Sequence, residues 1–235
     1  VGASLDDTVA EDSGAAYVFV RNGEDWSQQA KLTDASGGIG DEFGWSVALD
    51  GDRAAIGAPF KNGAGGAFVF DRAGITWGAP AVFSAFDAAA DDEFGYAVDV
   101  GGDTLVVGAS SDDHAAGVDA GSVYAFIRQP AGFWLGIKRT DDAGGAGDQF
   151  GSAVALDGSQ LLVGAPFDDE SQINQGSAVL LAGSLFSGQT KFVAPDGDAG
   201  DLFGSSVDLE TGGLSFGGTA IMGAPGDDET SPNAG

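Results

Sequence analysis

Carboxylates recur in pairs along this chain, beside glycine-rich stretches of the kind found in loops. One set consists of adjacent aspartates, and a second set stands two residues before a Phe-Gly dipeptide. Clustered carboxylates, together with the backbone carbonyls of Gly-rich loops, are hard oxygen ligands that suit Ca²⁺ better than zinc or copper. The sequence therefore predicts Ca²⁺ as a cofactor, with these candidate metal ligands: Asp92, Asp112, Asp113, Asp148, Asp168, Asp169, Asp201, Asp227 and Asp228.

Two other interpretations of the acidic pairs stay open. Asp and Gly are the ordinary residues of turns, where an Asp side chain accepts hydrogen bonds from its own backbone. A high net charge can also keep a protein dissolved, or adapt it to a salty medium. Only a metal site predicts a rise in melting temperature when calcium is added.

Catalytic chemistry has little support in the residue types. His114 is the only histidine and cysteine is absent, which leaves no basis for a zinc site or a Ser-His-Asp triad. Two close carboxylates could serve a glycosidase. The same pairs recur several times, however, whereas an active site is normally unique. We therefore expect a protein that is not an enzyme, with no catalytic residues.

The loops that carry these carboxylates belong to a repeated unit. Phe-Gly pairs begin at residues 43, 94, 150 and 203, and Gly-Ala pairs begin at residues 2, 57, 108, 164 and 223. Successive Phe-Gly pairs are 51, 56 and 53 positions apart. A period of this size indicates supersecondary units that bury their faces only against their neighbours.

Each unit contains four short apolar runs, which we interpret as strands a to d. Leu49-Asp50-Gly51-Asp52 and Leu156-Asp157-Gly158-Ser159 carry the Asp-Gly signal of a tight hairpin between a and b. Four antiparallel strands in about 50 residues are typical of a propeller blade. The predicted ranges are 45–49, 96–100, 152–156 and 205–209 for a; 54–56, 104–107, 160–163 and 219–222 for b; 16–21, 67–71, 122–128 and 177–181 for c; and 28–33, 79–86, 135–140 and 189–193 for d.

These units resemble the FG-GAP repeats of integrin α-chain propellers, and more closely the bacterial secreted branch of that family. The resemblance rests on the Phe-Gly and Gly-Ala pairs and covers essentially the whole chain. Further matching pieces are Trp26…Lys31-Leu32, Gly164-Ala165-Pro166-Phe167-Asp168-Asp169 and Ala16-Tyr17-Val18-Phe19. The turns between strands a and b are too short for the Asp-x-Asp-x-Asp-Gly calcium loops of integrins, so integrin calcium positions do not carry over.

The resemblance implies an all-β fold, a β-propeller of four-stranded antiparallel blades. We expect one continuous segment over 1–235: a partial blade at 1–40, blades at 41–90, 91–147 and 148–200, and a partial blade at 201–235. These contain 17 strands, one more than a closed four-bladed ring needs. Because the family's rings usually have seven blades, we expect an arc of about four blades from a longer array. Closure of the two ends, with one strand displaced, is the alternative.

In an antiparallel blade the d-to-a and b-to-c connections lie at one end, and the other turns lie at the opposite end. The candidate ligands fall in the first group, which predicts that Asp92 lies near Asp112 and Asp113, with the corresponding groupings in the next two blades. The basic residues Arg21, Arg53, Arg72 and Arg128 fall near the opposite end. One blade carries Lys61 where the others carry Asp-Asp, so we expect its ammonium to replace the cation beside Asp41 or Glu42.

The charge limits the partners. Asp and Glu total 36 against 9 Lys and Arg, a formal net charge of −27. Nucleic acid and anionic membranes are poor partners for such a surface, and no apolar run approaches the ~20 residues of a membrane span. We expect an extracellular, cell-surface or periplasmic propeller that mediates protein or glycan interaction. The alternatives are a structural subunit of a larger assembly, and an accessory propeller of a hydrolase whose catalytic part lies outside this sequence.

Overall fold

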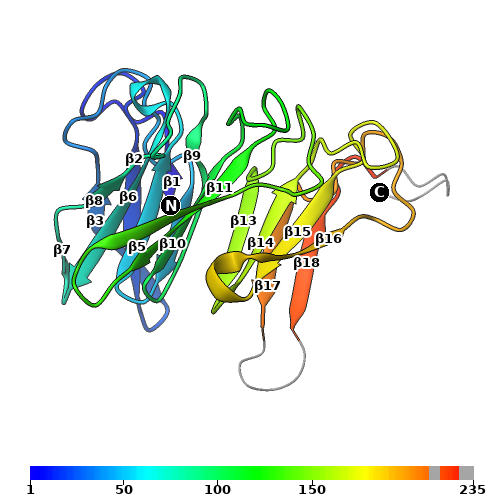
Figure 1. Cartoon of the computed structure of the whole chain (residues 1–235). Coiled ribbons are helices and arrows are strands. Elements are labelled where there is room, and N and C mark those ends of the chain that lie inside the picture. The colour runs from blue at the N-terminus through cyan, green and yellow to red at the C-terminus, as the bar shows by residue number, and fades with distance from the viewer. Residues whose placement is uncertain (212–217, 228–235) are drawn as a thin grey trace.

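The computed structural model describes residues 1–211 and 218–227, which form five antiparallel sheets in succession (Figure 1). The first contains β1 (Gly2–Ala3), β2 (Ala15–Asn22) and β3 (Asp25–Leu32). The second contains β4 (Val47–Asp50), β5 (Arg53–Ala58), β6 (Gly66–Ala73), β7 (Thr76–Trp77) and β8 (Ala81–Phe83). The third contains β9 (Phe94–Gly101), β10 (Thr104–Ala109), β11 (Ser122–Arg128) and β12 (Trp134–Arg139). The fourth contains β13 (Ala153–Asp157), β14 (Gln160–Ala165), β15 (Ser177–Ala182) and β16 (Gly188–Phe192), and the fifth contains β17 (Ser206–Glu210) and β18 (Thr219–Gly223).

The strand order a-b-c-d within a blade is confirmed, because hydrogen-bonded neighbours in each sheet follow the chain. The a strands β4, β9, β13 and β17 also contact one another from sheet to sheet. Two short 3₁₀ helices, η1 (Lys61–Gly63) and η2 (Ser184–Phe186), interrupt the connections. The all-β propeller-blade architecture predicted from the sequence is therefore present.

The a–b hairpins are built on the predicted two-residue turns. Asp50 pairs with Arg53, and Asp157 pairs with Gln160, which leaves only two residues in each loop. Gly51 and Gly158 adopt φ of 56° and 60°, as a primed turn requires. The outer strand of the second blade differs from its predicted range of 79–86. It is split into β7 and β8 around Gly78, Ala79 and Pro80, because proline has no N–H to donate to a ladder.

Aromatic rings fill the space between blades. Phe43, Phe94 and Phe150 of the Phe-Gly pairs are at most 1% exposed. Phe43 meets Phe68 edge to face with ring centroids 5.0 Å apart, and the same apolar cluster includes Leu32 of the preceding blade. The Phe residues of the first three pairs thus form core between blades, and Phe203 of the fourth pair is partly buried.

Glycine pairs allow the blades to approach closely. A Cβ atom on Gly108 would overlap the carbonyl oxygen of Gly151 in the next blade, and one on Gly164 would overlap that of Gly204. The N–H of Phe150 also donates 3.0 Å to the carbonyl of Ala120, in the b–c loop of the preceding blade. The Phe-Gly and Gly-Ala dipeptides therefore recur because they form one contact between successive blades.

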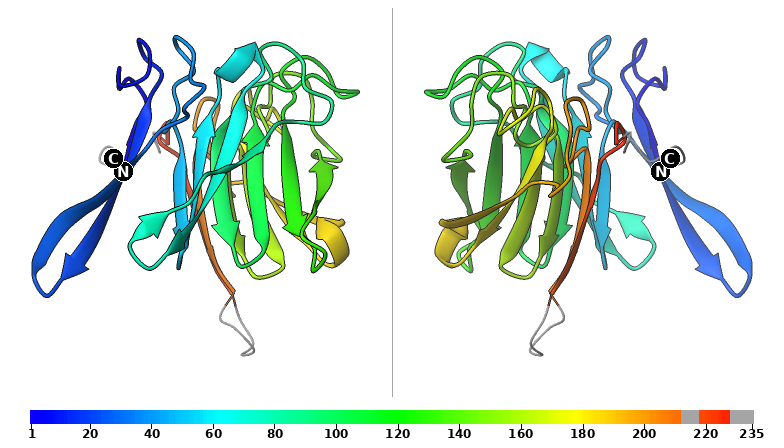
Figure 2. Two further views of the ribbon diagram at one scale, coloured as in Figure 1. Left: turned by 90° about the vertical axis from the view of Figure 1, so that its left-hand side faces the viewer. Right: turned by 90° about the vertical axis from the view of Figure 1, so that its right-hand side faces the viewer.

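The sheets follow one another along an open arc (Figures 1 and 2). In Figure 1, β1 and β18 lie at opposite sides of the molecule. Each is a b strand of its own sheet, since β1 pairs with β2 and β18 pairs with β17. The two ends of the described chain do not pair, so the closed four-bladed alternative is not what this structure shows.

Candidate functional site

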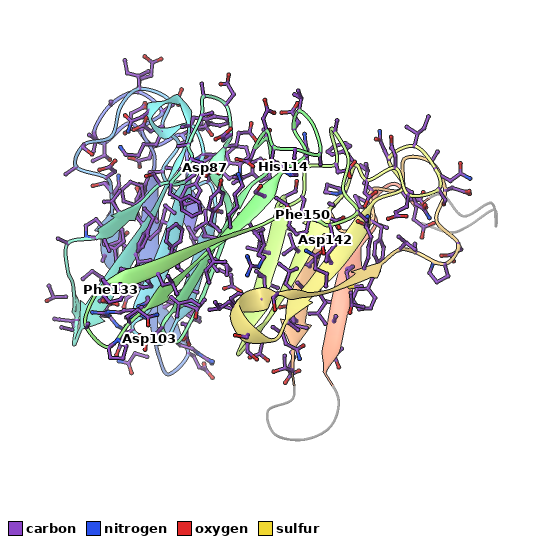
Figure 3. The ribbon with its side chains drawn as sticks, viewed as in Figure 1. Asp87, Asp103, His114, Phe133, Asp142 and Phe150 are labelled. Carbon is purple, nitrogen blue, oxygen red and sulfur yellow. The ribbon has the colours of Figure 1, made fainter. Side chains whose placement is uncertain are left out.

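The d–a and b–c loops gather at one end of the sheets, which we call the loop end. Figure 3 shows Asp87 and His114 near this end, and Asp103 and Phe133 at the opposite end. His114 is a loop residue, and one of its ring nitrogens lies 3.0 Å from the carbonyl oxygen of Gly121. The topology has therefore collected the predicted acidic residues on one side of the molecule.

A lysine occupies the middle of the carboxylates in the fourth sheet. The ammonium of Lys191 lies 2.9 Å from Asp141, 2.5 Å from Asp168 and 2.6 Å from Glu170. Asp168 also accepts a hydrogen bond of 2.5 Å from Ser177. Burial lowers the pKa of Lys191, but its close contacts with the charged carboxylates outweigh burial, so the pKa is raised. The ammonium stays charged and joins a d–a loop to the next b–c loop.

The third sheet repeats this arrangement with Lys138. Its ammonium lies 2.7 Å from both Asp87 and Asp112. Tyr124 donates to Asp87 at 2.7 Å, and Ser122 donates to Asp112 at 2.6 Å. Burial works against the charge of Lys138, yet the bonds to Asp112 and Asp87 raise its pKa. One ammonium thereby balances part of the charge of buried Asp112 and of the more exposed Asp87.

The first two sheets contain the same pairing in different forms. Lys31 bonds to Asp6 at 2.8 Å in the first sheet. In the second, Lys61 lies 2.5 Å from Asp34 and 3.4 Å from Asp41. An ammonium beside Asp41 was expected from the sequence, whereas Asp34 as its nearer partner was not.

The second blade differs from the other three in the element that supplies its lysine. Lys31, Lys138 and Lys191 occupy one register position of the outer strand, opposite Tyr17, Tyr124 and Val179. The corresponding position of β8 is Val82, opposite Phe68. There the ammonium comes instead from Lys61 in the b–c loop. The chain thus places one ammonium in each of these four clusters, from either of two elements.

The aspartates before each Phe-Gly pair have a different role. The carboxylates of Asp41, Asp92, Asp148 and Asp201 each accept the backbone N–H of the residue three positions earlier, at 2.5–2.7 Å. This is turn chemistry of the kind weighed against metal binding. Burial, and next to it the neighbouring charge of Asp112, raises the pKa of Asp92. Burial and the charge of Asp168 do the same for Asp148.

The predicted groupings of site residues can be followed in the structure. Asp92 lies within electrostatic reach of Asp112 and Asp113, and Asp148 of Asp168 and Asp169. The other residue of each Asp pair closes its own loop: Asp113 accepts the N–H of Asp119, and Asp169 accepts that of Asn174.

In the last blade, Asp201 and Asp227 belong to adjoining loops, since Gly226 donates to the carbonyl of Asp201 at 3.0 Å. Asp228 lies outside the described residues. One oxygen of the buried Asp201 carboxylate has no hydrogen-bond partner among the described atoms.

The donor set can be tested against a metal ion. A hollow of about 320 Å³ is lined by Asp148, Asp168, Asp169 and Glu170, with Gly145 nearby. These oxygens suit a hard cation. Two of the four residues, however, already contact the ammonium of Lys191. Within residues 1–211 and 218–227 there is no group of three or more His, Cys, Asp or Glu placed to hold a metal.

The position of the outer-strand lysines among the carboxylates was not predicted from the sequence. Lys31 was noted only as part of a motif. The signal was present, because each of these lysines lies shortly before a d–a loop and therefore at the loop end. In three blades, a lysine at the same register position of the outer strand therefore provides the ammonium of the cluster.

The opposite end carries arginine pairs, as expected. Arg53 bonds to Asp71 at 2.8 Å, and Arg72 lies 2.6 Å from Asp52. The guanidinium of Arg53 also stacks over Trp134 of the next blade, 5.9 Å from the ring. The two ion pairs join strands of the second blade, and the contact of Arg53 with Trp134 links that blade to the next at the end away from the acidic loops.

Successive four-stranded antiparallel sheets, joined by repeated Phe-Gly and Gly-Ala contacts, define a β-propeller protein that displays loops from its blades. The chain belongs to the FG-GAP repeat family, which matches residues 26–70, 77–126, 138–180 and 186–235. Repeats of this family are generally protein-interaction modules, and their proteins are typically extracellular or surface-associated. No curated protein matches the chain. Neither short helix in the described ranges has the length and apolar character needed to cross a membrane.

Proposed function

We propose that this chain is a non-enzymatic, extracellular or cell-surface propeller that binds a protein partner through the tips of its loop-end loops. The observation that supports the proposal is that the carboxylates of the loop end fall into two groups. Carboxylates at the base of the loops are paired with buried or half-buried lysines, whereas others at the tips are exposed. Exposed acidic tip residues include Asp7, Glu11, Asp91, Asp113, Asp142, Asp169, Asp196 and Asp198.

This arrangement suits recognition of a basic surface. Complementary charge raises association rates and suppresses wrong partners. Lysine–carboxylate contacts hold the loop bases together, which lowers the entropy lost when the tips bind. The loops also differ in sequence from blade to blade, and in a repeated scaffold such differences supply specificity.

The proposal is tested by binding to arrays of purified ectodomains and of glycans. We expect protein ligands whose binding is lost when Asp91, Asp142 and Asp198 are all changed to Lys. The matched control changes Glu24 and Asp25 to Lys, because both are exposed where the β2–β3 turn leads into β3, at the opposite end. If the chain binds glycans and no protein on these arrays, the partner is a sugar and the proposal of a protein partner is wrong. If the control variant lost binding equally, the loop end would not be the binding surface.

The calcium part of the sequence interpretation remains a prediction. Ca²⁺ would bind in the hollow that contains Asp148, Asp168 and Asp169, where it would compete with the ammonium of Lys191. A higher melting temperature in millimolar calcium than in chelator would support it. An unchanged melting curve would leave only turn chemistry and ammonium pairing.

A further inference from the structure

The lysine cluster of the second sheet is more enclosed than the other three. The side chains of Lys61, Asp34 and Asp41 are each 9% exposed. The lysines of the other three clusters are 18%, 19% and 26% exposed. The ring of Phe68 lies 5.8 Å from the Lys61 ammonium. Water therefore stabilises the charges of this cluster less than those of the others.

The Lys61 nitrogen faces the carboxyl group of Asp34. Nζ lies 2.5 Å from Oδ2. A nitrogen at hydrogen-bond distance from one carboxyl oxygen is also about 3–3.5 Å from the carboxyl carbon, the separation of a near-attack arrangement. The other oxygen, Oδ1, accepts the N–H and the hydroxyl of Ser36 at 2.9 Å and 2.8 Å. These two donors would stabilise the negative charge that develops on Oδ1 when a nucleophile adds to the carbon.

A second carboxyl group contacts the same nitrogen. Oδ2 of Asp41 lies 3.4 Å from Nζ of Lys61, and it accepts the N–H of Gly38 at 2.7 Å. A carboxylate at this position can take a proton from the nitrogen and pass it to a leaving oxygen. The cluster thus contains an amine nucleophile, a carboxyl carbon for it to attack and a proton carrier.

The backbones of both residues are held in place by their own loops. The carbonyl of Lys61 accepts the N–H of Gly65 at 2.9 Å. The carbonyl of Asp34 accepts the N–H of Gly37 at 3.0 Å. The stem of Lys61 packs on Gly66, where a Cβ atom would be 3.0 Å from its Cδ. Folding therefore positions the two side chains before they react, which lowers the entropy cost of the reaction.

The charge state of the pair sets how fast such a reaction can be. Burial raises the pKa of Asp34 and lowers the pKa of Lys61, which favours the neutral acid and the neutral amine. The hydrogen bond between the two residues outweighs burial, so the pKa of Asp34 is lowered and that of Lys61 is raised. The ion pair is therefore the main state of the freshly folded protein, and the neutral pair that reacts is a minor one. The reaction is accordingly slow.

We propose that Lys61 and Asp34 form an isopeptide bond after the chain has folded. The lone pair of Nζ attacks Cγ of Asp34, the Nζ–Cγ bond forms and the Cγ–Oδ2 bond breaks. Of the three ammonium protons, one stays on the amide nitrogen and two leave with Oδ2 as water. Asp41 carries one of these two protons from the nitrogen to the oxygen and ends unchanged. The step needs no oxidant, reductant or cofactor.

The bond would tie two loops of the loop end together. It joins the loop that follows β3 to the b–c loop of the second blade, between β5 and β6. An amide replaces two buried charges and so removes their desolvation cost. A covalent link between distant residues also restricts the unfolded chain, as a disulfide does. The chain has no cysteine, so no disulfide can supply this restriction.

Intact mass spectrometry of the purified chain tests the proposal. The folded protein is held for several days at mildly acidic and at neutral pH, and its mass is compared with the mass that its sequence gives. We expect a growing fraction that is lighter by one water molecule, and after proteolysis a branched peptide that joins Lys61 to Asp34. An unchanged mass at both pH values overturns the proposal. A branched peptide that joins Lys61 to Asp41 overturns Asp34 as the acceptor.

A second reaction that loses water has to be distinguished from the isopeptide bond. Asp-Gly sequences lose one water molecule when they form a succinimide, and the chain contains them at residues 50–51, 157–158 and 196–197. Lys61→Arg keeps a positive charge beside Asp34 but has no amine to acylate, so it should give no branched peptide and no matching loss of mass. Hydroxylamine cleaves a succinimide and leaves an isopeptide bond intact. A mass loss that persists in Lys61→Arg, or that hydroxylamine removes, contradicts the proposal.

Two further comparisons test the proton carrier and the effect of burial. Asp41→Asn should slow bond formation by about a hundredfold, because an amide cannot carry the proton. Circular dichroism checks that this variant keeps its fold, and an unchanged rate in the folded variant would exclude Asp41 from the reaction. Lys138 and Lys191 are controls within the same molecule, since they contact carboxylates but are more exposed. Branched peptides at these lysines in equal yield would show that burial is not what permits the bond.

Discussion

Gly108 shows how a single backbone contact can require a dipeptide motif. Its Cα hydrogen faces the carbonyl of Gly151 in the next blade, and a methyl group would overlap that oxygen. We expect Gly108→Ala to lower the free energy of unfolding by about 3 kcal/mol, since neither backbone can move without disturbing a sheet. Urea denaturation measures the change. Gly101→Ala in the same blade is the control, because a Cβ there would only touch a side-chain atom of Leu156 at 3.4 Å. Equal effects would remove the close contact as the cause.

Lys191 is the residue on which the fourth-sheet cluster depends. Lys191→Met keeps the aliphatic stem but leaves Asp141 and Asp168 without their cation. Removing one partner of a buried ion pair costs about 3–5 kcal/mol, and we expect the lower end of that range because the ammonium is partly exposed. The melting temperature of Lys191→Met should fall accordingly, while Lys191→Arg should keep most of the stability of the parent chain.

Adding calcium to this variant distinguishes metal binding from ammonium pairing at the Lys191 cluster. In Lys191→Met the freed oxygens of Asp141, Asp168 and Glu170 can approach a divalent ion. We expect calcium to raise the melting temperature of this variant more than that of the parent chain. If calcium stabilises neither, Asp141, Asp168 and Glu170 act in this cluster as partners of the ammonium and not as metal ligands.

At the scale of elements, strand order and hairpins could be predicted because they depend on local patterns. Leu49-Asp50-Gly51-Asp52 specifies its turn, and alternating apolar residues specify the strands beside it. The outer strand near Val82 was placed too far along the chain, because its packing is set by β6 and not by its own sequence. The ammonium positions were missed because they depend on register between strands, which composition does not reveal. Lys61 was the exception, because it replaces an acidic pair directly.

If the outer strand and the b–c loop can each supply the ammonium of a cluster, a lysine in one should replace a lysine lost from the other. Lys61→Met should destabilise the second blade, since Asp34 and Asp41 are buried beside it. Val82→Lys places an ammonium at the register position used by Lys31, Lys138 and Lys191. We expect the double variant to recover at least half of the lost unfolding free energy in thermal or urea denaturation. Thr76→Lys, at an exposed position of β7, should recover none. Recovery by both lysines would indicate a general charge effect only.

At the scale of the whole molecule, the net charge of −27 and the burial of individual carboxyls act together on stability. Burial, as the main cause, raises the pKa of Asp92, Asp99 and Asp148 above their ordinary value of 3.8. A raised folded-state pKa means that stability is fully present below the unfolded pKa and is lost as the pH rises through the folded pKa. Asp34 and Asp87 have the opposite sign: burial raises their pKa values, but bonds to Lys61 and Lys138 outweigh it and lower them. Their contribution is present above pH 3.8 and is lost as the pH falls below it.

These opposing signs predict a stability maximum close to the ordinary Asp pKa of 3.8, in acidic solution. We expect the melting temperature to fall from there toward neutral pH, and to fall steeply in stronger acid as the partners of Lys61 and Lys138 are protonated. Calorimetry at constant ionic strength measures the profile. Asp148→Asn should flatten the decline toward neutral pH, because the amide can still accept the N–H of Gly145 without repelling Asp168. Asp25→Asn, at the exposed first residue of β3, should leave the profile unchanged. A melting temperature that rises steadily to neutral pH would show that the buried carboxyls are ionised in the fold without penalty, contrary to their burial.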